Sequence, residues 1–171
     1  LQKIRRCIAE DLNMGKPVYL KNRWYIAGLS NEVADKPVGR RLLSEPVVLY
    51  RTTHGAPVAL EDRCCHRQAA LSLGDIEGDN LRCGYHGLLF DGSGHCIEVP
   101  SQKEIPPGAW VNSYPTQEKQ GFLFVWMGDP KMADSVTPYE HSYLDRPGWT
   151  TQTAQFHAKC NYRLLIDNLL D

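Results

Sequence analysis

Two short pairs of cysteine and histidine constrain this chain more than any other feature of its sequence. Cys64 and His66 have one residue between them, and Cys83 and His86 have two. Residues 67–82 separate the pairs, and their turn-forming residues, at 74–75 and 78–80, would fold the chain back on itself. The two pairs are therefore expected to lie on neighbouring loops around one metal site.

The four side chains limit the kind of metal site. Two thiolates and two imidazoles are the ligands of a Rieske 2Fe-2S centre, in which the cysteines bind one iron and the histidines the other. The same groups also suit tetrahedral zinc, although structural zinc sites usually keep cysteines and histidines in separate pairs. The mixed pairs thus favour the cluster over zinc. The Cys-x-His spacing selects Cys64 as the ligand and leaves Cys65 as a bystander.

Composition excludes several classes of protein. The chain has 171 residues, of which 42% are hydrophobic and 23% charged, as in ordinary folded proteins. The formal net charge is -1 and no long basic run occurs, so nucleic acid is not an expected partner. The longest apolar run, 122–127, is far shorter than the roughly 20 residues that span a membrane. Residues 1–13 carry charges at both ends and no apolar stretch of the kind that a secretory signal has, so the protein is expected to be cytoplasmic.

Turn residues predict a mainly β fold, since the sequence contains 14 Gly and 11 Pro. A connection at 138–147 should lead to another strand within 149–159. A helix is expected over Tyr162–Asp171, with Asn161 as its N-cap. Strands are expected at 24–27, 40–43, 46–50, 57–60, 81–82, 88–90, 95–97 and 122–126, with a hairpin turn at 53–55.

Both ends of the sequence suggest that it differs from the natural protein. Residues 1–13 differ in character from the stretch after Met14 and are interpreted as a non-native or upstream leader. No Gly, Pro or basic residue ends the helical pattern at Asp171, so the C-terminus is interpreted as a truncation.

The segments around the two pairs, RCCHR and LRCGYHGLLFDGSGHC, resemble the cluster loops of Rieske non-haem iron oxygenases. The stretches at 22–25, 128–130 and 167–171 resemble terminal oxygenase (alpha) subunits of the vanillate O-demethylase type. The resemblance implies a Rieske 2Fe-2S antiparallel β domain, similar to the iron-sulfur protein (ISP) fold, at 14–148. The first strand and helix of a truncated α+β catalytic domain would follow at 149–171. The family usually has proline at positions 65 and 84, which are cysteine and glycine here.

The resemblance also implies residue roles. Cys64, His66, Cys83 and His86 would hold the 2Fe-2S cluster. Mononuclear Fe(II) would be bound by two histidines and a carboxylate that come after Asp171, in the pattern Asp-x2-His-x4-His. Asp171 would bridge a cluster histidine, here His86, and an iron-ligating histidine of a neighbouring subunit, and Asn168 would lie near that iron. Without the cluster loops, Asp171 would be interpreted as a solvated helix carboxylate.

The implied activity is hydroxylation or O-demethylation of a small aromatic substrate with O2, in a homotrimer. Electrons would come from NAD(P)H through a separate reductase or ferredoxin. The alternative is a Rieske-type ferredoxin, an electron carrier without catalysis, but such carriers end soon after the cluster domain and the segment 149–171 favours the oxygenase.

Other polar residues around the motifs receive smaller roles. Arg67 and Tyr85 are candidates for contacts with the cluster or its ligands, which would tune its potential. Cys7, Cys96 and Cys160 have no partner at ligand spacing and are expected to be small buried residues. The four remaining histidines, 54, 95, 141 and 157, are expected to be surface or packing residues.

Overall fold

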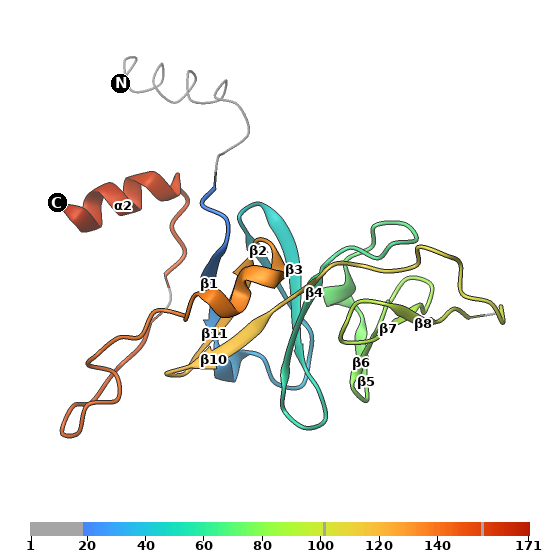
Figure 1. Cartoon of the computed structure of the whole chain (residues 1–171), viewed down its shortest axis with the longest axis horizontal. Helices are drawn as coiled ribbons and strands as arrows, with labels where there is room; N and C mark the ends of the chain where they lie inside the picture. Colours follow the sequence, from blue (N-terminus) through green and yellow to red (C-terminus); the bar gives the residue numbers. More distant parts are fainter. Residues whose placement is uncertain (1–18, 101, 155) are drawn as a thin grey trace, which may run out of the picture. The chain divides into compact units, whose positions relative to one another are not determined.

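The computed structural model describes residues 19–100, 102–154 and 156–171, which form two units (Figure 1). The first unit ends at Glu140, and the second is His141–Asp171. The proposed leader at 1–13 lies outside the described residues. Within the described residues, no helix combines the length and the apolar character that a membrane crossing requires.

The first unit consists of three antiparallel sheets. Sheet one has the order β1-β11-β10 and contains β1 (Arg23–Leu29), β10 (Thr116–Lys119) and β11 (Phe122–Met127). Sheet two has the order β2-β3-β4-β9 and contains β2 (Val38–Leu42), β3 (Glu45–Arg51), β4 (Pro57–Glu61) and β9 (Ser113–Tyr114). Sheet three has the order β5-β6-β7-β8 and contains β5 (Asp75–Glu77), β6 (Asn80–Arg82), β7 (Leu89–Phe90) and β8 (Cys96–Glu98). Short 3-10 helices are η2 (Ser30–Glu32), η3 (Leu71–Leu73) and η4 (Pro130–Ser135).

Strand β3 separates two hydrophobic cores because alternate residues of a strand face opposite sides of the sheet. Val47 and Leu49 enter the first core, between sheets one and two, while Val48 and Tyr50 enter the second core, which includes residues of sheets two and three. Figure 1 shows sheet three on the opposite side of the β3–β4 hairpin from β1 and β11. The second core contains Val48, Tyr50, Leu60, Cys64, Leu71, Leu81, Cys83, Leu88, Phe90, Cys96 and Val111.

Most predicted elements are confirmed. Each predicted strand up to residue 126 overlaps an observed one, and the β3–β4 turn contains Gly55 in a left-handed conformation, with φ 81°. The helix α2 (Tyr162–Leu170) is also present, and the Asn161 side chain caps it by accepting a hydrogen bond from the Arg163 amide. Its residues are all exposed.

The observed strands differ from the predicted ones in two ways. The strands β5, β9 and β10 were not expected, because they are short and polar and only their pairing partners define them. Conversely, a strand is predicted within 149–159, but the described residues of this segment form no strand. A strand needs a neighbour for its backbone groups, and no strand of the described chain pairs with this segment.

Candidate metal centre

The two cysteine–histidine pairs lie on loops with the same backbone hydrogen bonds. In the first loop, the Cys64 amide donates to the Ala69 carbonyl (2.8 Å) and the Gln68 amide donates to the Cys64 carbonyl (2.9 Å). In the second, the Cys83 amide donates to Leu88 (2.8 Å) and the Gly87 amide to Cys83 (3.0 Å). The chain thus presents each cysteine at the same position of an equivalent turn.

The left-handed residue of each turn also occupies the same position. Gln68 has φ 59° and Gly87 has φ 75°, each four residues after the loop cysteine. Glycine adopts this conformation at little cost, whereas Gln68 does so against the preference of an L residue.

Separate contacts anchor the first loop to the rest of the unit. The Asp62 amide donates to the Pro46 carbonyl (3.0 Å), which fixes the chain two residues before Cys64. The Asp62 carboxylate accepts hydrogen bonds from the Ser72 amide and hydroxyl, both at 2.6 Å. Asp62 therefore ties the entry of the first loop to η3.

Gly74 lets the segments that carry the two loops approach closely. A Cβ atom at this position would collide with the carbonyl oxygen of Arg82 and crowd the Gly84 amide. The absence of a side chain at Gly74 is thus required for the second loop to take its position.

Burial divides the four predicted ligands into two kinds. The Cys64 and Cys83 side chains belong to the second core, and each residue is 2% exposed. His66 and His86 are exposed, and their ring centroids lie 4.8 Å apart. The structure therefore brings two thiols together on the inner side and two imidazoles together on the outer side.

Burial makes the charged form of the Cys64 thiol costly. Burial raises the pKa of Cys64 to about 12, and the nearby Cys83 thiol adds to the rise, while the His66 backbone amide opposes it through a hydrogen bond to the sulfur. A bound metal compensates such a cost because it stabilises the thiolate directly. A metal ion bound by the two sulfurs would therefore offset the cost that burial imposes on their charged form.

The arrangement of the four groups fits two metal ions better than one. Tetrahedral zinc would require all four ligands around one point. A 2Fe-2S cluster instead needs a cysteine side and a histidine side, and that is the division observed between core and surface.

The structure also places the residues adjacent to the ligands. Cys65 is half-buried and packs against the second core, in line with a bystander role. The Tyr85 ring lies against the His86 imidazole, with centroids 3.9 Å apart, and is 61% exposed. Among the described residues its hydroxyl forms no hydrogen bond to a cysteine. Arg67 is exposed beside the first loop.

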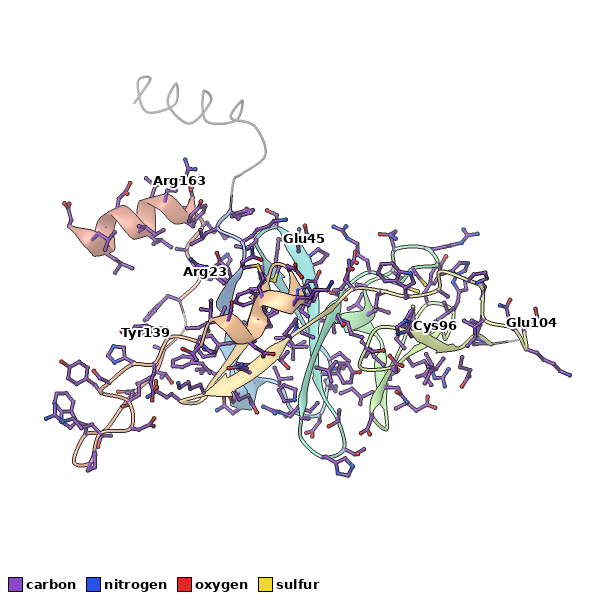
Figure 2. All side chains as sticks on the ribbon, viewed as in Figure 1. Arg23, Glu45, Cys96, Glu104, Tyr139 and Arg163 are labelled. Carbon is purple, nitrogen blue, oxygen red and sulfur yellow. The ribbon has the colours of Figure 1, made fainter. Side chains whose placement is uncertain are left out.

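Two of the three other cysteines can be compared with expectation. Cys96, which Figure 2 labels in sheet three, is 5% exposed and belongs to the second core, as expected. Cys160 is exposed, so its prediction as a buried residue is wrong. It lies in the second unit just before α2, where no buried residues surround it. Cys7 lies outside the described residues.

A groove borders the histidine side of the site. It has a volume of about 680 Å³ and is lined by both histidines, Cys65, Leu88 and part of the segment 99–109. Figure 2 shows Glu104, within that segment, at the outer end of the loop that follows β8. Sequence reasoning missed this third segment, although its prolines, 100, 106 and 107, mark an irregular loop.

The two residues predicted for the oxygenase step lie in the second unit. Asn168 is an exposed residue of α2, and Asp171 is the C-cap of the helix. The four predicted cluster ligands are all in the first unit. The bridge from Asp171 to a cluster histidine of another subunit therefore stays a prediction.

Comparisons with known proteins agree with this geometry. Residues 23–115 match the family model of the Rieske [2Fe-2S] domain. The chain is 45% identical over 155 residues to the toluene-4-sulfonate monooxygenase system iron-sulfur subunit TsaM1 of Comamonas testosteroni, covering 90% of this chain and 45% of that protein. It is 40% identical over 154 residues to the vanillate O-demethylase oxygenase subunit of Pseudomonas sp. strain HR199, covering 90% and 43%.

Solved structures give the same result. The crystal structure of dicamba monooxygenase bound to dicamba superposes with a TM-score of 0.83 at 39% identity, covering 91% of this chain and 50% of that one. The chain thus spans about half the length, or less, of these relatives. The likeness to oxygenase subunits of the vanillate O-demethylase type is confirmed, and the mainly β fold with it. On its paired loops, its buried cysteines and its match over 23–115, the chain belongs to the Rieske [2Fe-2S] domain family.

Proposed function

We propose that this chain is the cluster-bearing part of the oxygenase component of a Rieske monooxygenase that hydroxylates or O-demethylates a small aromatic compound. The observation that carries the proposal is the pair of equivalent loops, with two buried thiols and two exposed imidazoles. One relative is named as the iron-sulfur subunit of a monooxygenase system and another as an oxygenase subunit, and both names support the catalytic part over a free ferredoxin. The Rieske domain would cover 14–148, and the catalytic part would begin at 149–171.

Each ligand has a separate task in this proposal. Cys64 and Cys83 would hold the inner iron, and His66 and His86 the outer one. A 2Fe-2S cluster held in this way supplies one-electron transfer. The core around the cysteines excludes water from the sulfur side, whereas the exposed imidazoles offer an edge through which a partner can exchange an electron.

The remaining roles concern the whole protein. A reductase or ferredoxin would deliver electrons to the histidine side, and O2 would be activated at mononuclear Fe(II). Asp171 would connect His86 to that iron in a neighbouring subunit of a cytoplasmic homotrimer, and Asn168 would lie beside it. The relatives' names support the electron donor and the aromatic substrate. The trimer rests on the family resemblance, and the location rests on residues 1–13, which lack the pattern of a secretory signal.

Absorption and EPR spectroscopy of the purified full chain would test the cluster. A red-brown protein with two irons and two sulfides per chain, and a reduced Rieske EPR signal, is expected. A colourless protein that contains zinc would contradict the proposal.

Reading the coding sequence beyond Asp171 would separate the oxygenase from the ferredoxin. The oxygenase requires the continuation Asp-x2-His-x4-His and a later carboxylate. A stop codon or other residues would leave an electron carrier, and the catalytic proposal would have to be withdrawn.

A further inference from the structure

Arg82 directly precedes the ligand Cys83, and its side chain is more than two-thirds buried, with 26% exposed. An arginine side chain has five N–H donors in a rigid fork, and here each has an acceptor. Nε and Nη2 donate to the Glu77 carboxylate at 2.5 and 2.9 Å. Nη1 and Nη2 donate to the Glu98 carboxylate at 3.1 and 3.4 Å. Nη1 also donates to the Gly87 carbonyl at 2.7 Å.

These bonds connect three segments of the cluster-binding region. Glu77 lies in β5 and Glu98 in β8, on either side of β6 and β7 in the sheet order. Gly87 belongs to the second ligand loop and directly follows His86. Arg82 therefore ties the loop to the sheet that supports it.

Gly87 is held at both of its backbone polar groups. Its amide donates to the Cys83 carbonyl at 3.0 Å, and its carbonyl accepts from Arg82. The residue has φ 75°, in the region that favours glycine. The Cys83 bond thus holds the His86–Gly87 peptide and the Arg82 bond holds the Gly87–Leu88 peptide, so the Gly87 backbone that follows His86 has little freedom to rotate.

The first loop has no comparable brace, although the sequence offers the same residue. Arg63 precedes Cys64 as Arg82 precedes Cys83, but Arg63 is exposed. Within the described residues, Arg63 forms no ion pair of the kind that Arg82 forms. The first loop is instead anchored through Asp62 and Ser72. Arg63 and Arg82 thus occupy equivalent sequence positions, but within the described residues only Arg82 braces the ligand loop that follows it.

We propose that Arg82 is a positioning residue for the metal centre. By binding the Gly87 carbonyl, Arg82 fixes the backbone directly after His86 and so the orientation of the His86 side chain. The inference rests on the ligand roles proposed above. Lysine keeps the positive charge but has a single nitrogen with three donors, so it cannot reproduce the five hydrogen bonds that the planar guanidinium makes to Glu77, Glu98 and Gly87. Partners that orient metal ligands typically change metal affinity ~10- to 100-fold when they are removed.

The test compares Arg82→Lys with Arg63→Lys in the full chain purified with its cluster. Both substitutions preserve charge, so a difference between them reports on the hydrogen bonds. Arg82→Lys is expected to speed cluster loss to a chelator by about 10- to 100-fold, and to change the EPR g-values and the reduction potential. Arg63→Lys is expected to match the unsubstituted chain in all three measurements.

A second measurement uses the chain without metal. Hydrogen exchange at the Gly87 amide is expected to be faster in Arg82→Lys than in Arg63→Lys, because the loop loses its brace. If Arg82→Lys does not fold, Glu77→Gln weakens the same fork and should shift cluster loss and exchange in the same direction.

Three outcomes would contradict the Arg82 inference, and the last of them would also contradict the proposed function. Unchanged cluster loss, EPR and exchange in Arg82→Lys would overturn the inference. A lower melting temperature with unchanged cluster properties would overturn it too, since Arg82 would then serve only stability. An unsubstituted chain that takes up no 2Fe-2S cluster would instead overturn the proposed function, and the inference with it.

Discussion

Adjacent residues in the first loop have different environments. Cys64 is 2% exposed and its sulfur accepts a hydrogen bond from the His66 amide, whereas Cys65 is half-buried at the edge of the second core. The backbone turn that begins at Cys64 has its counterpart at Cys83, which makes Cys64 the equivalent ligand position. The position of Cys64 in its loop thus supports the prediction that Cys64, and not Cys65, is the ligand.

Alanine at each of these two positions should give opposite results. Cys64→Ala removes an iron ligand and is expected to abolish the cluster absorption, whereas Cys65→Ala should retain it with at most a modest loss of stability, since only a small side chain at the core edge is removed. Iron and sulfide analysis of the two purified variants provides the measurement. Retention of the cluster in Cys64→Ala, with loss in Cys65→Ala, would reverse the assignment.

Residue-level prediction from sequence succeeded where the chemistry is local. The spacing of Cys64, His66, Cys83 and His86 predicted the grouping that the structure shows, because a metal ligand set is confined to a few residue types. It failed for Cys160, whose exposure depends on what surrounds it in three dimensions. The bonds of Arg82 were also missed, since its partners at 77, 87 and 98 carry no sequence signal in common.

Between elements, Gly74 shows how the site depends on close packing. Gly74→Ala places a methyl group against the Arg82 carbonyl and the Gly84 amide, neither of which can move without displacing the second loop. A loss of roughly 1–3 kcal/mol in the free energy of unfolding is expected, as for other overpacked sites. Chemical denaturation of the metal-free chain would measure it.

Gly92→Ala is the matched control for that substitution. A Cβ there would meet the two Val58 methyl groups at 3.5 and 3.7 Å, which are ordinary contacts, and the position has no left-handed φ. Its effect should remain within about 0.5 kcal/mol. Equal losses in both variants would show that the collision at Gly74 relaxes without cost.

Tyr50 connects β3 to the β5–β6 turn and makes the stability of the protein vary with pH in the alkaline range. Its hydroxyl donates to the Asp79 carbonyl at 3.1 Å. Burial, with smaller contributions from the Asp91 and Asp79 carboxylates, raises the pKa of Tyr50 from 10.0 to about 12. Between these values the folded state keeps a proton that the unfolded state releases, so the contribution of Tyr50 to stability should decline as pH rises from 10 and be lost above about 12.

Denaturation at several pH values, with Tyr50→Phe as the comparison, would check this dependence. The variant lacks the titrating group, so its stability should fall less steeply over the same range. A part of the slope should persist because burial also raises the pKa of Tyr114 to about 12. At neutral pH the variant should lose about 1 kcal/mol with the hydrogen bond. Identical slopes in both proteins would exclude Tyr50 as the source.

Elements were predictable where their own residues are apolar and periodic. The strand at 122–127 is almost fully buried and was readable from its composition, whereas β10, with the sequence TQEK, is defined by its pairing with that strand. The segment 149–159 shows the converse, since strand-forming residues without a neighbour form no strand in the described chain. Partner strands, which lie far away in sequence, supply the missing information.

At the scale of the whole molecule, the two units differ in what stabilises them. The first has two cores, and β3 contributes residues to both. The second has no buried residue among those described, and α2 exposes Leu169 and Leu170 by 80% and 82%. Burial of apolar surface supplies most of the free energy of folding, so the first unit should account for nearly all of the chain's stability.

Hydrogen exchange should therefore divide the chain at the boundary between the units. Amides of β3 are expected to exchange only through global unfolding, whereas those of Tyr162–Leu170 should exchange close to the rate of an unfolded peptide. A helix of nine residues is short of the length at which isolated helices become stable in water, and its Asn161 cap contributes only about 1 kcal/mol. Mass spectrometry of peptides from the full chain resolves the two segments. Slow exchange in α2 matching that of β3 would mean that its leucines are covered in solution, and in that case Asn161→Ala should leave the protection largely intact.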